Sequence, residues 1–241
     1  MSEKLGEDAY FRQTHRPLVC LAFLMPWVMA YEVGTLVVGT SADTVPPRHV
    51  VAYLLLEQFF NLFGATALYL PGLALVAILL AWHVAARDRW SFRFKTLLGM
   101  LAESALLALP LVLFNQLLAS RPAGKVTSWS EDLVLSVGAG IYEELLFRLI
   151  CITLLSILLV DLLKIQRGTA LVLMVVISSL VFAAHHYPPL GSDPWHLASF
   201  LFRAIAGGYL ATLFVVRGFG IAAGCHIVYD LLVVTWTAIH A

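Results

Sequence analysis

The sequence is short of charge. Only 12% of its 241 residues are charged, against about 25% in an average soluble domain, while 61% are hydrophobic. A soluble protein of this size cannot bury so much apolar surface, so the lipid bilayer is the expected environment. Acidic and basic residues number 15 each, which leaves no net charge and no sign of a nucleic-acid-binding surface.

Cysteine is also scarce. The three cysteines, Cys20, Cys151 and Cys225, lie far apart in apolar runs, without CxxC spacing. This pattern argues against a disulfide framework and against a cysteine-based metal site. We expect small apolar packing residues, although Cys225 stands directly before His226, which leaves a reactive thiol as an alternative.

Long apolar runs dominate the rest of the chain. A helix needs about 20 apolar residues to cross a hydrocarbon core of about 30 Å. Residues 49–63 are shorter and are expected to lie in the interface or to form an eighth span. Because lipid accepts only helices and closed barrels, the sequence predicts an all-α, polytopic bundle of seven to eight spans. The seven main segments are 17–38, 65–86, 97–118, 133–160, 169–186, 196–216 and 218–239. The first exceeds the roughly 7–15 apolar residues of a cleaved signal, so we expect a membrane helix.

Motif-like polar residues occur only in the second half. We therefore divide the chain into 1–129, membrane helices without an assigned motif, and 130–241, an expected catalytic core.

Lysine and arginine in short loops mark the cytoplasmic side. Seven spans with a cytoplasmic N-terminus place ten such residues inside and three outside. We expect a multi-pass plasma-membrane protein of the bacterial inner-membrane type. The inner residues are Lys4, Arg12, Arg16, Arg87, Arg89, Arg93, Lys95, Lys164, Arg167 and Arg217, and the outer ones Arg48, Arg121 and Lys125.

The first informative cluster lies about ten residues inside the span 133–160. A charge at the bilayer centre costs about 2.5–3.5 kcal/mol on insertion scales and usually faces a partner or a cavity. Glu144 and Arg148 are four residues apart, so they share a helix face and are expected to pair. Glu143 points about 100° away from Glu144. It finds no cation in this segment and becomes a candidate acid–base group.

Histidines supply the other two clusters. His185 and His186 end the span 169–186, and because adjacent residues point to different faces, we expect only one of them at a given site. His226 and Asp230 are four apart in the span 218–239, so the carboxylate can fix the tautomer of the imidazole or hold it as the cation. The alternative for each cluster is a self-satisfied structural pair.

Two chemistries fit one glutamate and two histidines. Glu143 and His186 can activate a water for attack on a carbonyl, with His226 and its neighbour stabilising the oxyanion. Alternatively, the same three groups can bind zinc with one position open. The HExxH and G-x-S-x-G signatures are absent from the sequence. We therefore favour water activation, with neither cofactor nor metal.

At these residues the sequence resembles the CPBP family of intramembrane glutamic endopeptidases, which includes the CAAX prenyl proteases of the Rce1 type and bacteriocin-processing or immunity proteins. The resemblance covers roughly residues 130–240. It implies that Glu143 and His186 activate water, that His226 and Asp230 form the oxyanion hole, and that Glu144 and Arg148 support the site. Asp230 stands where the prenyl proteases have asparagine. An ionised aspartate cannot donate a hydrogen bond to an oxyanion, so Asp230 would either orient His226 or act in its protonated form. The motifs EExxxR, FxxxH and HxxxN/D read here Glu143-Glu144 to Arg148, Phe182 to His186, and His226 to Asp230.

The resulting hypothesis is a metal-independent protease. It would hydrolyse a peptide bond near the C-terminus or the membrane-proximal segment of a membrane-associated protein or peptide, with the bilayer and that substrate as its partners. A non-catalytic immunity or scaffold protein of the same family is the alternative. A proton-coupled transporter is a third possibility, disfavoured because no inverted repeat is visible. His186 lies near the predicted outer end of its span, so the site is expected to open outwards.

Overall fold

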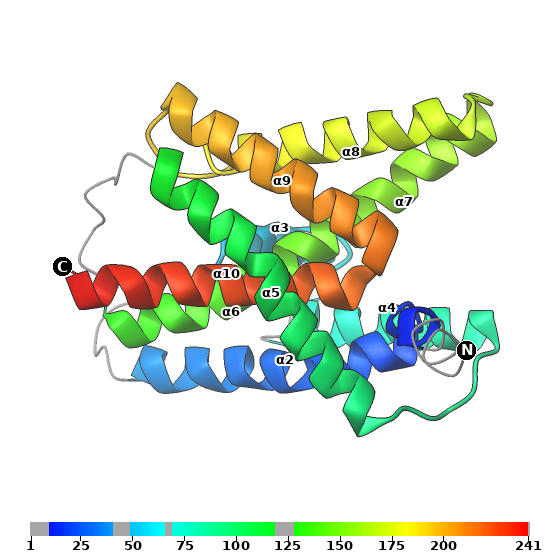
Figure 1. Cartoon of the computed structure of the whole chain (residues 1–241), viewed down its shortest axis with the longest axis horizontal. Coiled ribbons are helices and arrows are strands. Elements are labelled where there is room, and N and C mark those ends of the chain that lie inside the picture. The colour runs from blue at the N-terminus through cyan, green and yellow to red at the C-terminus, as the bar shows by residue number, and fades with distance from the viewer. Residues whose placement is uncertain (1–9, 41–48, 66–68, 119–127, 241) are drawn as a thin grey trace.

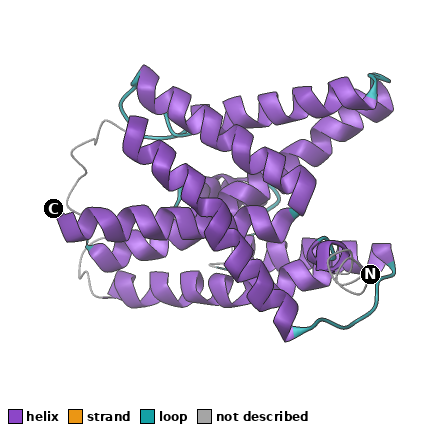
Figure 2. Cartoon of the chain, viewed as in Figure 1, coloured by secondary structure: helices purple, strands orange, loops and turns teal. Residues whose placement is uncertain are grey.

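The computed structural model describes residues 10–40, 49–65, 69–118 and 128–240. Every regular element within these residues is helical, as the sequence predicted (Figure 2). The predicted outer-loop residues Arg48, Arg121 and Lys125, and Lys4 near the N-terminus, lie outside this part of the chain. The elements are α2 (Pro17–Thr40), α3 (Val51–Asn61), α4 (Leu70–Ala86), α5 (Phe94–Leu118), α6 (Trp129–Glu144), η1 (Leu145–Ile150), α7 (Cys151–Ser156), η2 (Ile157–Leu162), α8 (Arg167–Ala184), α9 (Leu197–Arg217) and α10 (Phe219–His240).

Six helical segments in the described residues are long and apolar enough to cross a membrane, and α4, with 17 residues, is a shorter apolar helix. Each of the seven predicted segments thus corresponds to a helix or a continuous run of helices. Helix α3 has 11 residues and is therefore about 16 Å long, roughly half the thickness of the hydrocarbon core. It does not qualify as an eighth span.

One of these segments is a continuous helical run, Trp129–Leu162. It begins where the Ser128 side chain accepts a hydrogen bond from the backbone of Glu131 at 3.2 Å, a favourable N-cap. It then changes from α6 into the π-helical turn η1 directly after Glu144. Such π-helical turns are frequent at functional sites.

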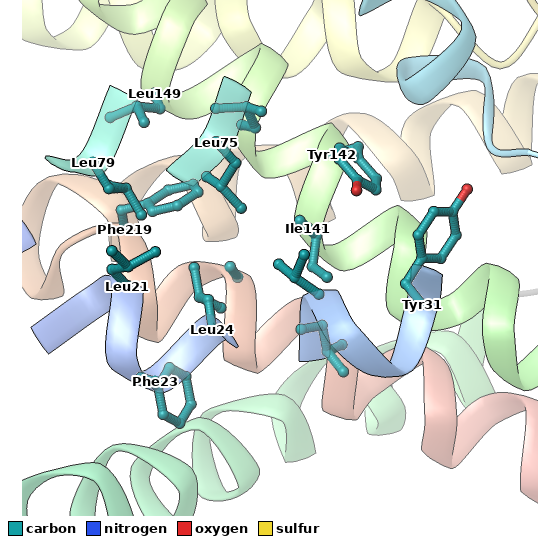
Figure 3. Packing of buried hydrophobic residues seen from close by; sticks show 14 of the residues in the cluster. Leu21, Phe23, Leu24, Tyr31, Leu75, Leu79, Ile141, Tyr142, Leu149 and Phe219 are labelled. Carbon is teal, nitrogen blue, oxygen red and sulfur yellow. The ribbon is translucent and has the colours of Figure 1, made fainter. Parts of the chain in front are cut away.

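Helix α10 lies at the centre of the bundle and packs against α6, α5, α9 and α2 (Figure 1). Helices α6 and α10 approach closely because Gly140 has no side chain: a Cβ there would come within 2.6 Å of the backbone nitrogen of Ile227. Only Gly218 separates α9 from α10, and its φ of 88° is in the region that favours glycine. Apolar side chains of α2, α4, α6 and α10 form the largest core cluster (Figure 3).

Several intramembrane polar residues outside the motifs pair with one another. The Arg217 guanidinium contacts the Glu103 carboxylate at 2.5 Å, and the Tyr10 hydroxyl donates to the same carboxylate at 2.7 Å. These contacts tie the segment before α2 to α5 and to the end of α9. The Tyr142 hydroxyl likewise donates to Glu32 at 2.6 Å and joins α6 to α2. Glu32 and Glu103 thus join helices to one another.

Candidate active site

The candidate site lies where α6, α10 and the end of α8 meet. Glu143 and Glu144 close α6, while His226 and Asp230 lie one turn apart on α10. All four predicted catalytic residues, Glu143, His186, His226 and Asp230, line one cavity of about 290 Å³. A water occupies about 30 Å³ in the liquid, so the cavity has room for several water molecules beside a substrate backbone.

Glu143 lies between imidazole rings. Its side chain is only 8% exposed. One carboxylate oxygen lies 3.4 Å from Nε2 of His185 and the other lies 3.9 Å from Nε2 of His226. One potential ligand atom each of Glu143, His185 and His186 falls within 4.8 Å of the other two. The carboxylate is thus buried among imidazoles, the environment in which it can exchange protons with a water.

Both histidines of the second motif lie beside Glu143, and His186 is the one of the two that lines the cavity. Helix α8 ends at Ala184, two residues earlier than predicted, and His185 and His186 form a turn before Tyr187. Proline disfavours helix in the residue that precedes it, and Pro188 and Pro189 follow directly. Outside the helix, the 100° separation of neighbouring side chains no longer holds, and the rings lie 3.9 Å apart between centroids.

The tautomers of these two rings follow from their shared acceptor. The backbone carbonyl of Phe182 can only accept, so Nδ1 of His186, at 3.0 Å, and Nδ1 of His185 both donate to it. When neutral, each ring therefore has its lone pair on Nε2. His186 lies beyond the last residue of its span, and burial lowers its pKa to about 4. It is neutral at neutral pH and can accept a proton.

A second layer of charges orients His226. Its Nδ1 donates to Glu144 at 2.9 Å, and its Nε2 lies 3.5 Å from the Asp230 carboxylate, as their four-residue spacing suggested. The other oxygen of Glu144 lies 3.1 Å from Nε of Arg148, an ion pair that the spacing also predicted and in which both side chains are fully buried. Arg148 also donates to the backbone carbonyl of Gly207 on α9 at 3.3 Å. The pair thus connects three helices behind the cavity.

Two polar residues in the cavity wall lie outside the three motifs and were not singled out from the sequence. Asn115 comes from α5 and Arg203 from α9. Each is an isolated polar residue in an apolar run. Neither has a second motif residue four positions away, the spacing that marked the three motifs. An arginine six residues into a span was the one available signal, because intramembrane cations usually face a partner or a cavity.

Apolar helices thus surround a cavity of about 290 Å³ whose wall carries a carboxylate and imidazoles. Residues 125–232 match the family model described as type II CAAX prenyl endopeptidase Rce1-like. This stretch is therefore similar to an Rce1-like protease domain, which confirms the resemblance seen in the three motifs, and the candidate spans describe a multi-pass membrane protein. Comparisons with curated proteins and with solved structures found no match. The family match covers a little under half of the 241 residues.

Proposed function

We propose that the protein is an intramembrane endopeptidase of the glutamic type. It hydrolyses a peptide bond near the C-terminus, or in the membrane-proximal segment, of a membrane-associated protein or peptide. One observation carries this proposal: Glu143, His186, His226 and Asp230 come from three separate segments and line the same buried cavity within an Rce1-like domain. Residues 130–241 would form the catalytic core and residues 1–129 its supporting helices.

The nucleophile in this mechanism is a water held between Glu143 and His186. The lone pair on Nε2 of His186 orients the water, and Glu143 takes one of its protons as the oxygen attacks the carbonyl carbon. The new C–O bond produces a tetrahedral oxyanion. Glu143 then passes its proton to the amide nitrogen, the C–N bond breaks, and the products are a carboxylic acid and an amine. The Nε2 lone pair of His185, 3.4 Å from Glu143, would accept a hydrogen bond from the carboxyl group while Glu143 carries the proton between the two transfers.

His226 supplies the oxyanion stabilisation in this scheme. Because its Nδ1 donates to Glu144, the ring can offer a second N–H, from Nε2, only as the imidazolium. The carboxylates of Glu144 and Asp230 on either side of the ring favour that cation. Donors aimed at the position where charge develops are usually the largest catalytic contribution. We assign Asp230 to the orientation of His226, and Glu144 with Arg148 to its support.

Comparative proteomics of protein C-termini tests the proposal. Cells that produce the wild type should contain shortened C-termini, or cleaved membrane-proximal segments, that are intact in cells producing Glu143→Ala at the same membrane level. The shortened termini would identify the substrate. A scaffold or immunity protein predicts the opposite: identical termini in the two cell types, with the cellular phenotype retained in the variant.

A metal-dependent hydrolase is the second candidate, and the convergence of Glu143, His185 and His186 specifically favours it. One carboxylate oxygen and two imidazole nitrogens match the donor set of many catalytic zinc sites. The two neutral rings offer their Nε2 lone pairs, since both Nδ1 atoms donate to Phe182. A bound zinc ion would supply a polarised water, and Glu143 would then be a ligand rather than a base.

Chelation separates the two candidates. Under the water-activation mechanism, dialysis against 1,10-phenanthroline should leave the cleavage rate of the purified protein unchanged, because no step needs a metal. Added Zn²⁺ should inhibit, since it competes for Glu143 and His186, the two groups that hold the water. A loss of activity on dialysis that stoichiometric Zn²⁺ restores would instead establish the metal enzyme.

The cellular location extends this proposal. We propose that the protein lies in the plasma membrane, as in a bacterial inner membrane, with a cytoplasmic N-terminus. The distribution of lysine and arginine along the sequence supports this orientation.

A further inference from the structure

Arg203 brings a permanent positive charge into the wall of the catalytic cavity. It lies on α9 and lines the cavity together with Glu143 and His186. It is the only lysine or arginine among the described residues that form this wall. The carboxylates of Glu143 and Asp230 also line the wall, and His226 is the imidazolium that faces the oxyanion in the proposed mechanism. An anionic group of the substrate that lies away from His226 is therefore repelled by the carboxylates, unless it meets Arg203.

The surroundings of Arg203 hold one side of its guanidinium and leave the other side unpaired. Nη2 lies 2.5 Å from the Asp193 carboxylate, and the guanidinium carbon lies 5.2 Å from the centre of the Tyr187 ring. Nη1 is buried and has no hydrogen-bond partner among the described residues. A buried donor without an acceptor is unfavourable, and such exceptions require an explanation. The contacts with Asp193 and Tyr187 fix the side chain while one N–H group remains available.

The position of Asp193 is itself fixed. Its backbone N–H donates to the carbonyl of His186 at 3.1 Å, so the loop after α8 carries both a cavity residue and the partner of Arg203. The charge of Arg203 also reaches the cavity: it adds to the lowering of the pKa of His186, of which burial is the main cause. The guanidinium is thus held beside the reacting groups by contacts that do not use Nη1.

We infer that Arg203 binds a carboxylate of the substrate through Nη1 and so sets the position of the cleaved bond. A guanidinium N–H and a carboxylate form a charge-assisted hydrogen bond, which is about twice as strong as a neutral one. The inference rests on the proposed endopeptidase function and narrows its substrate class. Two sources supply such a group: the C-terminal carboxylate of the substrate, or an acidic side chain next to the cleaved bond. The terminal carboxylate would make the enzyme count residues from the end of its substrate.

Fluorogenic peptides with one apolar sequence and three different ends test this inference. The first ends in a free carboxylate, the second in an amide, and the third in an amide preceded by glutamate. With the wild type in liposomes, we expect kcat/KM to be about 10- to 100-fold higher for the free acid than for the amide, mainly through KM. Preference for the third peptide over the free acid would assign the subsite to an acidic side chain.

Two variants separate recognition from structure. Arg203→Gln should lose the preference for the acid: the ratio of kcat/KM for the acid peptide to kcat/KM for the amide peptide should fall to about one, whatever the change in the overall rate. Asp193→Asn breaks the same ion pair but keeps the guanidinium, so it should retain the preference. Arg167→Gln removes an exposed arginine at the start of α8 and should behave as the wild type.

The failure of this inference is distinct from the failure of the proposed function. Equal cleavage of the acid and amide peptides by the wild type, or an unchanged preference in Arg203→Gln, would overturn the role of Arg203 and leave the protease intact. Absence of cleavage of all three peptides would count against the endopeptidase. Binding to Glu143→Gln protein then still tests Arg203: the acid peptide should bind more tightly than the amide, and Arg203→Gln in that background should remove the difference.

Discussion

Replacing Glu143 by glutamine is expected to lower kcat for peptide cleavage by at least about 10³-fold, within the range that general acid–base groups contribute. Glutamine keeps the size of the side chain but cannot take a proton from water or return one to the leaving amine. Both transfers in the proposed mechanism pass through this carboxylate, so the whole reaction is affected rather than one step. The measurement is single-turnover cleavage by equal amounts of wild-type and variant protein in liposomes.

The stability of this variant distinguishes lost chemistry from lost structure. Glu143 is a buried charge. Glutamine removes the free-energy cost of burying that charge, and its amide can still form a hydrogen bond with His185. The thermal unfolding midpoint of Glu143→Gln should therefore not fall below that of the wild type. Asp161→Asn makes the same chemical change at an exposed position in η2 and should keep full activity. Cleavage by Glu143→Gln within tenfold of the wild type would remove this residue from the mechanism.

The sequence predicted contacts within a helix more successfully than contacts between helices. Apolar run length located the spans, with ends mostly within a few residues, because hydrocarbon thickness constrains helix length. Four-residue spacing predicted the Glu144–Arg148 ion pair and the proximity of His226 to Asp230, since both follow from helical periodicity. These features depend only on local geometry, which the sequence specifies directly.

The cross-helix partners were not accessible in this way. Nothing in the spacing assigns Nδ1 of His226 to Glu144, 82 residues earlier, because that contact depends on the close approach of α6 and α10 at Gly140. His185 was set aside because periodicity was extended two residues beyond the actual end of α8. The Pro188-Pro189 pair was the signal that the helix ended sooner.

The depth of the groups was equally hard to predict. Sequence position placed His186 near a membrane face and Glu143 near mid-depth, yet the two meet in one cavity. The helical run that carries Glu143 has 34 residues and would be about 51 Å long as an ideal α-helix, well beyond a hydrocarbon core of about 30 Å. A run of this length must tilt strongly or extend out of the bilayer. Counting residues from its predicted end therefore gives a poor measure of depth.

Replacing Arg148 by methionine is expected to lower the free energy of unfolding by about 3–5 kcal/mol, the largest loss among the proposed variants. The substitution breaks a buried ion pair and leaves the Glu144 carboxylate without its partner. Arg148 has no exposed surface, and its guanidinium lies 4.3 Å from the centre of the Phe182 ring while it pairs with Glu144. Methionine fills a similar volume, so lost packing contributes little. The measurement is the free energy of unfolding in mixed micelles with increasing denaturant.

The double variant Glu144→Gln/Arg148→Met shows whether the loss comes from the charge. Replacing both partners of a buried pair by neutral groups is often neutral or stabilising, so the double variant should recover most of the stability that the single variant loses. Its activity should stay low, because the ring of His226 no longer donates to a carboxylate through Nδ1. An Arg148→Met protein as stable as the wild type would show that Glu144 does not need this cation. A double variant with full activity would show that the orientation of His226 comes from Asp230 and the surrounding packing, so that Glu144 is a structural residue only.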